Sequence, residues 1–199
     1  MPKGTNRLWT TARKLPGNVL PLLLSCPFLV YGIKHFPAKG LSPDVLLGLI
    51  AFPIVTWVGT NYLGLIGNSG LKREMGKRLH HERPFDRSDK TFVGFAPPKF
   101  NSLLDPHEDV GFLILHPDHL EFWGSDVKVE LSRKSIHSIK FRPNPHSVVG
   151  LGRWISIEGE SGAKPVRLLV EPRERATLLG NRALGSKLKA EIEAWLGHP

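Results

Sequence analysis

The chain has 199 residues, a formal net charge of +9 and a sequence pI near 9.9. Its hydrophobic content of 41% excludes a disordered chain, and its single cysteine, Cys26, excludes a disulfide scaffold and a cysteine-based zinc site. A basic chain of this length invites a nucleic-acid-binding interpretation, so the positions of the charges decide which partner they serve.

Two stretches in the first third of the chain, residues 15–33 and 45–71, contain no formally charged side chain. A surface helix of a soluble protein would show polar residues at every third or fourth position. At about 1.5 Å per residue, the shorter stretch covers about 28 Å, close to the hydrocarbon thickness of a bilayer. We therefore expect a transmembrane hairpin within residues 15–71, with spans at about 15–33 and 45–67. The prolines at positions 21 and 27 would each interrupt a backbone hydrogen bond of the first span.

A cleaved signal peptide is the alternative for the first stretch, because the basic tail of residues 1–14 precedes it. The length of the stretch, its two interior prolines and the lack of a small-residue cleavage site favour a retained span.

The excess basic residues flank the two spans. The tail of residues 1–14 carries four basic residues and no acidic one, and residues 72–90 carry seven basic and four acidic residues. Cytoplasmic flanks of spans are rich in Lys and Arg, so we expect both termini in the cytoplasm and only residues 34–44 outside. Residues 91–199 hold 14 basic and 13 acidic residues, and this near-neutral balance argues against a nucleic-acid partner.

Small and polar residues recur every four positions in and after the second span, at Thr56, Thr60, Gly64 and Asn68. Such a face favours close helix packing against the first span. A substrate path or a site for a partner helix is the alternative. No ionisable Asp, Glu, Lys, Arg or His lies inside either span, which argues against a proton relay.

Residues 68–90, which include the basic juxtamembrane linker of residues 72–90, carry an apolar stripe at Leu71, Met75 and Leu79. The spacing predicts a short amphipathic helix along the membrane surface. Cations here can hold anionic lipid headgroups at about 1 kcal/mol per residue. The alternative, a solvated orientation signal with no specific lipid, is favoured. The cations in question are Lys72, Arg73, Lys77 and Arg78.

From residue 91 onward the apolar residues alternate with polar ones. This period of two predicts strands within residues 92–95, 110–115, 119–123, 127–131, 136–141, 153–158 and 165–170. Ser186 is expected to cap a final helix whose stripe is Leu188, Ile192 and Trp195. The predicted fold class is α+β: two transmembrane helices, then a small antiparallel sandwich or open barrel over 91–199, plugged by the C-terminal helix.

The apolar rhythm of residues 111–123, followed by Val129-Glu-Leu131 and Ile136-His-Ser-Ile139, resembles pleckstrin-homology-like (PH-like) domains, and among these the GRAM and bacterial branches. The resemblance covers residues 91–197 and implies a non-catalytic, bacterial, cytoplasmic interaction module, here in the inner membrane. The insertion at 96–109 departs from the pattern. The turn at 116–119 has no Lys or Arg, so phosphoinositide binding is not implied.

Signals of catalysis are scarce. His116 and His119 have the spacing of a metal pair, but Pro117 and Asp118 predict a turn, and the third ligand would have to come from His107, Glu108 or Asp109. The sequence contains no nucleophile elbow, phosphate loop or zinc-protease helix motif. We therefore expect no catalytic residue, no cofactor and no metal.

A second group of cations belongs to neighbouring predicted strands and turns. They are Arg133, Lys134, Lys140, Arg142, Arg153 and Arg167. They would either form a lipid-binding surface or pair across strands with Glu121, Glu130 and Glu158, and cross-strand pairing is favoured.

The sequence thus predicts a non-catalytic integral membrane protein whose cytoplasmic PH-like domain contacts a protein, a peptide or the lipid surface. The expected partners are membrane lipids and either another protein or a second copy of the chain. The alternatives are an accessory subunit of a larger membrane complex and a membrane-embedded enzyme with its site where the helices meet the domain.

Overall fold

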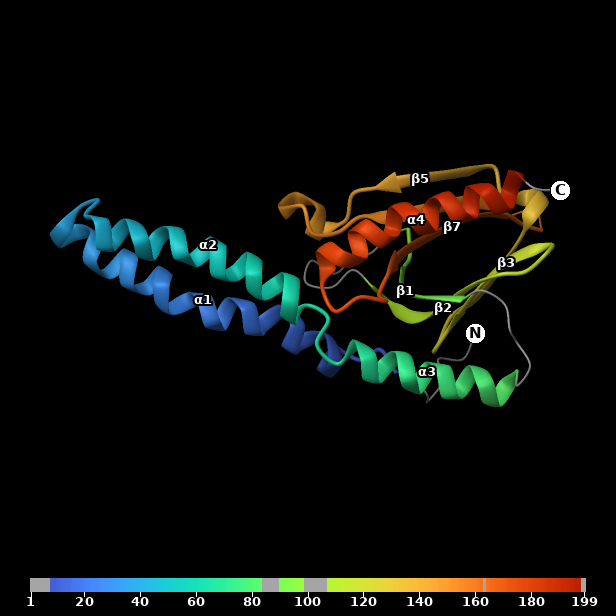
Figure 1. Ribbon diagram of the computed structural model, residues 1–199, viewed down its shortest axis with the longest axis horizontal. Helices are drawn as coiled ribbons and strands as arrows, with labels where there is room; N and C mark the ends of the chain where they lie inside the picture. The colour runs from blue at the N-terminus through green and yellow to red at the C-terminus, as the bar shows by residue number, and fades with distance from the viewer. Residues whose placement is uncertain (1–7, 84–89, 99–106, 163, 198–199) are drawn as a thin grey trace.

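The computed structural model describes residues 8–83, 90–98, 107–162 and 164–197. Helices α1 (Thr11–Lys39) and α2 (Pro43–Leu63) form an antiparallel hairpin that projects from a compact sheet-and-helix region (Figure 1). The start of α1 and the end of α2 both meet that region, and the connection at 40–42 lies at the far end. Both helices are long and apolar enough to cross a membrane.

The two long helices approach most closely through small residues. A Cβ added to Gly17 would lie 2.8 Å from the carbonyl oxygen of Gly64. The Thr56 hydroxyl donates to Ser25 Oγ over 2.7 Å. Helix α1 continues through Pro21, and the Pro21 ring lies against Gly59. Small residues therefore set how closely the hairpin closes.

Helix α2 ends at Leu63, four residues before the expected end of the second span. A turn follows in which Gly67 has a φ of 79°, the left-handed region that glycine adopts without strain. Helix α3 (Asn68–Glu82) then begins in a new direction. Asn68 therefore does not share the helical face of Thr56, Thr60 and Gly64, which corrects the expected packing series; Thr60 is half-buried on α2.

Seven antiparallel strands form one sheet in the order β4-β3-β2-β1-β7-β6-β5. All seven fall where the alternating pattern predicts them. They are β1 (Lys90–Ala96), β2 (Asp109–Leu115), β3 (His119–Gly124), β4 (Lys128–Ser132), β5 (Ser138–Arg142), β6 (Trp154–Ser161) and β7 (Lys164–Pro172). Short 3-10 helices η1 (Arg133–Ser135) and η2 (Pro145–Val149) flank β5. Most of the 96–109 insertion, residues 99–106, lies outside the described residues.

Helix α4 (Leu178–Gly197) covers one face of the sheet (Figure 1). Its Leu188 and Ile192 are buried with Phe122 and Ile155 of the sheet. The helix begins eight residues before Ser186, so Ser186 is not its cap; the Ser186 hydroxyl instead accepts a hydrogen bond from Arg153 Nη2.

Helix α3 covers the other face of the sheet. Met75 and Leu79 are fully buried against Phe112 and Trp123, and the N-terminal Trp9 belongs to the same cluster. The apolar stripe of α3 therefore packs on protein and not on a membrane surface, which corrects the expectation for the linker. The sheet lies between α3 and α4 as the middle of three layers.

Candidate functional site

The junction between the hairpin and the sheet is held by hydrogen bonds and apolar contacts. Asn61 Oδ1 on α2 accepts the backbone N–H of Leu179 over 2.9 Å. Leu65, Leu151 and Leu178 form a small buried cluster beside it. The domain is therefore docked on the end of α2 and is not suspended on a flexible tether.

A buried arginine continues this junction to the start of α3. Arg173 Nε donates to Asn68 Oδ1 over 2.9 Å, and the guanidinium lies 4.4 Å from the centre of the Trp9 ring. Asn68 Nδ2 in turn donates to the Arg173 carbonyl. This buried guanidinium needs both partners, Asn68 and Trp9, because an unpaired buried charge is costly.

A cavity of about 800 Å³ opens beside this arginine, between the end of α2, the first turns of α3 and residues 173–176. Tyr62 and Leu65 form its apolar edge. Five of its lining residues are cationic and one, Glu174, is acidic. The five cations are Lys72, Arg73, Lys90, Arg173 and Arg175.

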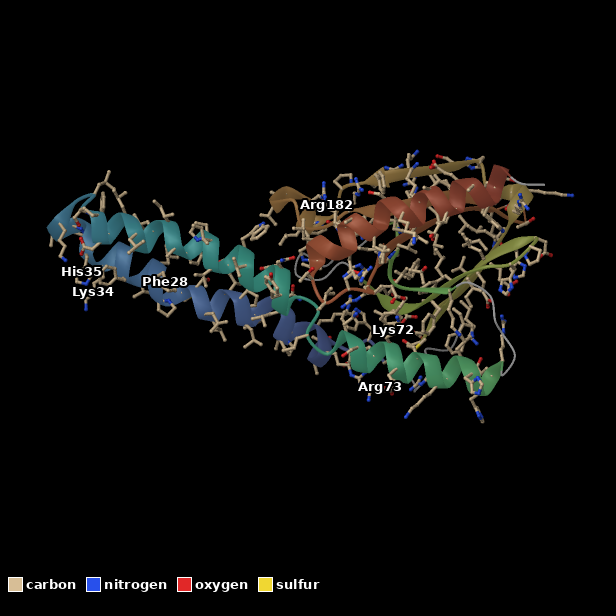
Figure 2. All side chains as sticks on the ribbon, in the orientation of Figure 1. Phe28, Lys34, His35, Lys72, Arg73 and Arg182 are labelled. Carbon is tan, nitrogen blue, oxygen red and sulfur yellow. The ribbon has the colours of Figure 1, made fainter. Side chains whose placement is uncertain are left out.

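The charges of the cations in this cavity are not all available to a ligand. Lys72 is paired with Glu174, whose other oxygen accepts the Phe92 N–H over 2.7 Å. Arg73 and Arg175 are exposed and have no ion-pair partner within the part of the chain that the structure describes. Figure 2 shows Lys72 and Arg73 on α3, close to where the hairpin begins. The cavity thus offers charge-assisted donors to an anion such as a phosphate group.

The other cations expected to bind headgroups do not gather in this cavity. Arg78 pairs with Glu74 on α3 at 3.6 Å, and Lys77 is exposed on the same helix. Arg133 lies 5.3 Å from the Trp195 ring centre, and Lys134 is exposed on η1.

Cross-strand ion pairing explains three further cations of this group, whereas Arg153 extends to Ser186 instead of pairing with an acid. Glu158 on β6 is paired with Lys140 and Arg142 of β5 at 3.0 and 2.9 Å, and with Arg167 of β7 at 2.9 Å. Hydrogen bonds from Lys140 and Arg142 lower the pKa of Glu158 to about 2. Of the three acidic residues expected as partners, Glu158 is the one that pairs with Lys140, Arg142 and Arg167.

This network predicts a pH-dependent loss of stability in Glu158→Gln. The lowered pKa means that the carboxylate stabilises the fold above about pH 4.3, the unfolded value, and that this contribution is lost as the pH falls towards 2. We expect a loss of about 1 kcal/mol at pH 7 and a much smaller loss near pH 2, where half of the folded-state carboxylates are protonated. Urea unfolding at both pH values measures it. The control is Glu130→Gln, at an exposed position of β4. An equal loss of stability in both variants would contradict the prediction.

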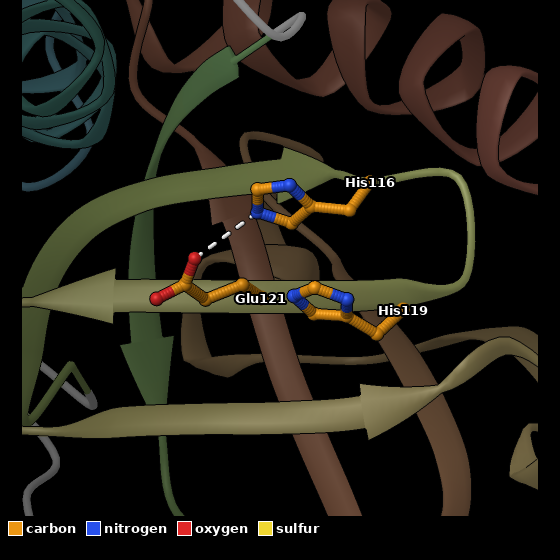
Figure 3. A group of neighbouring side chains, drawn as sticks. All are labelled: His116, His119 and Glu121. Carbon is orange, nitrogen blue, oxygen red and sulfur yellow. Dashed lines mark hydrogen bonds and ion pairs between the residues drawn. The ribbon is translucent and has the colours of Figure 1, made fainter. Parts of the chain in front are cut away.

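Three potential metal ligands lie at the β2–β3 turn, His116, His119 and Glu121 (Figure 3). His116 Nε2 lies 3.1 Å from Glu121 Oε2, and the two imidazole rings are stacked with centres 4.2 Å apart. Their ring planes differ by 14°, so one cation cannot lie in both planes without a ring rotation. Arg83 Nη1 also forms an ion pair with Glu121 Oε2 at 2.6 Å. The geometry favours an ion-paired cluster over a metal site.

The third member of this cluster, Glu121, is not one of the candidates that the sequence analysis named for a metal site. His107 Nε2 faces Glu171 at 3.3 Å, and Asp109 accepts the backbone N–H groups of Asp126 and Val127. Glu121 takes their place because alternate residues of β3 point to the same side, a signal present in the sequence. His119 donates to Asp118 and thereby lowers the pKa of that carboxyl group.

Buried Glu171 is a further group that sequence reasoning missed. Its carboxylate accepts Asn144 Nδ2 over 2.9 Å and the Arg153 N–H over 3.2 Å. A Cβ added to Gly152 would lie 2.6 Å from Glu171 Oε1, so this glycine permits the close approach of the backbone to the carboxylate.

Comparison with known protein families and with curated proteins found no match to this chain. The antiparallel seven-stranded sheet followed by a C-terminal helix is compatible with a PH-like domain.

Proposed function

We propose that this protein is a non-catalytic integral membrane protein that holds a PH-like domain against the cytoplasmic surface of a bacterial inner membrane. The length of α1 and α2 and their exposed apolar side chains support membrane crossing; Leu47 and Val30, for example, are 70% and 61% exposed. The basic flanks of the hairpin support cytoplasmic termini.

The function of the domain in this proposal is recognition of anionic lipid headgroups. The observation that carries it is the cationic cavity at the end of α2, where Arg73 and Arg175 face an opening bordered by Tyr62. With α2 in the membrane, this cavity lies at the level of the headgroups. The charge and the position together favour a lipid over a peptide as the ligand.

Membrane insertion is checked first. The full-length protein should stay in the pellet after carbonate washing and ultracentrifugation of membranes, and a C-terminal tag should be protected in sealed right-side-out vesicles. Release into the supernatant would contradict the proposal.

Lipid recognition is tested on the full-length protein in detergent by native mass spectrometry. The ligands are phosphatidylglycerol, phosphatidylcholine and inorganic phosphate. We expect the double variant Arg73→Gln/Arg175→Gln to bind phosphatidylglycerol about thirty-fold more weakly, from about 1 kcal/mol per cation near the headgroups.

The matched control is Lys134→Gln/Lys164→Gln, which removes two exposed cations elsewhere on the domain. It should bind phosphatidylglycerol as the wild type does. Equal binding of phosphatidylcholine would contradict charge recognition, and equally tight binding of inorganic phosphate would show that the cavity takes a soluble anion instead of a lipid.

A further inference from the structure

The connection between β5 and β6 carries an exposed apolar tip. It contains η2 (Pro145–Val149), where Val148 is 90% exposed and Val149 is 50% exposed. An isolated exposed valine is ordinary on a protein surface. Two consecutive exposed valines at the end of a projecting loop are more informative here, because helix α2 lies beside them.

The tip lies alongside α2 and not beyond its end. Trp57 Nε1 donates to the carbonyl oxygen of Val149 over 2.9 Å. Trp57 precedes the last residue of α2 by six positions, which is about 9 Å along the helix axis. Figure 1 shows the loop between β5 and β6 reaching from the sheet toward the hairpin. Wherever α2 is surrounded by lipid at Trp57, Val149 is at the same depth.

The backbone of the tip is already hydrogen-bonded, as a low-dielectric environment requires. Asn144 and Ser147 form a reciprocal capping box at the start of η2. At its end, the N–H groups of Gly150 and Leu151 donate to the carbonyls of Ser147 and His146. The Trp57 indole satisfies the Val149 carbonyl. The tip therefore buries little unpaired polar backbone when it leaves water.

Two arginine side chains lie between the apolar tip and helix α4. Arg182 on α4 donates to the Gly152 carbonyl over 2.8 Å, and Arg153 extends to Ser186. Figure 2 labels Arg182 at the end of α4 that faces the hairpin. Apolar residues at the tip with arginines behind them match the order of acyl chains and anionic headgroups in a membrane surface.

We propose that the β5–β6 loop inserts Val148 and Val149 into the boundary between headgroups and acyl chains of the same bilayer that α2 crosses. The lipid bilayer is the occupant because the tip is continuous with the apolar surface of α2. The inference rests on the proposed membrane crossing and adds a third contact with lipid, which fixes the orientation of the domain relative to the membrane.

The test uses the full-length protein in phosphatidylcholine–phosphatidylglycerol nanodiscs, with Cys26→Ala removing the one native cysteine. Val148→Cys carries an environment-sensitive fluorophore. Leu47→Cys, on the exposed surface of α2, reports membrane crossing. Ser161→Cys, at the opposite end of β6 from the loop, reports the aqueous side. Quenching is measured with a nitroxide near the carbonyl end of the acyl chain and with aqueous iodide.

We expect the probe at 148 to show a blue-shifted emission, quenching by the lipid nitroxide and loss of iodide quenching, whereas the probe at 161 is quenched by iodide alone. If 148 behaves like 161 while 47 is shielded from iodide, the loop inference is wrong and membrane crossing stands. If 47 is also open to iodide, the proposed membrane crossing itself is wrong.

Discussion

Alanine at Met75 should lower the free energy of unfolding by about 2 to 5 kcal/mol, the usual cost of truncating a fully buried large side chain. Met75 is 0% exposed, between α3 and the sheet. Guanidinium unfolding in detergent, followed by tryptophan fluorescence, measures the change, since Trp123 belongs to the same cluster.

Lys77→Ala is the matched control for Met75→Ala, because Lys77 is exposed on the same helix. Its stability should stay within about 0.5 kcal/mol of the wild type. If both variants unfolded like the wild type, α3 would not be a layer of the domain, and the membrane-surface interpretation of its apolar stripe would regain support.

The second large effect is expected at the polar contact between α3 and β7. Asn68→Ala leaves the buried Arg173 Nε without its Asn68 acceptor, and the loss of a hydrogen bond to a charged group costs about 1.5 to 3 kcal/mol. Asn68→Asp keeps an acceptor and should recover much of this stability.

Thermal unfolding of the full-length protein in detergent checks this order: wild type, then Asn68→Asp, then Asn68→Ala. Ser69→Ala, at the exposed neighbouring position, should unfold with the wild type. An Asn68→Ala variant as stable as Ser69→Ala would show that the junction does not depend on this contact.

The strands were predictable because their side chains alternate, and the two long helices because they lack charge. The packing of α3 was not predicted, although strand β2 held a signal for it. In β2 the apolar residues occupy both sets of alternate positions: Phe112 and Ile114 belong to one buried cluster and Leu113 to the other. A strand that is apolar on both faces needs a cover on each, and α3 is the second cover.

The candidate site was only half predictable. Lys72 and Arg73 were predicted as candidate headgroup-binding cations from their position after the second span. Arg173 and Arg175 lie about one hundred residues later, and no local pattern indicates that the chain returns them to the same cavity. The partners of Glu158 were easier to predict, because neighbouring strands bring alternate residues opposite one another.

Trp9 has a consequence for how the protein is made. It precedes α1, yet its indole donates to the carbonyl of His107 and its ring lies against Arg173. The ribosome must synthesise most of the chain before this tryptophan finds its neighbours, so the earliest residues cannot reach their final position until Arg173 has been made. Proteolytic processing after the first span would also remove Trp9 from the core and leave a void beside Arg173.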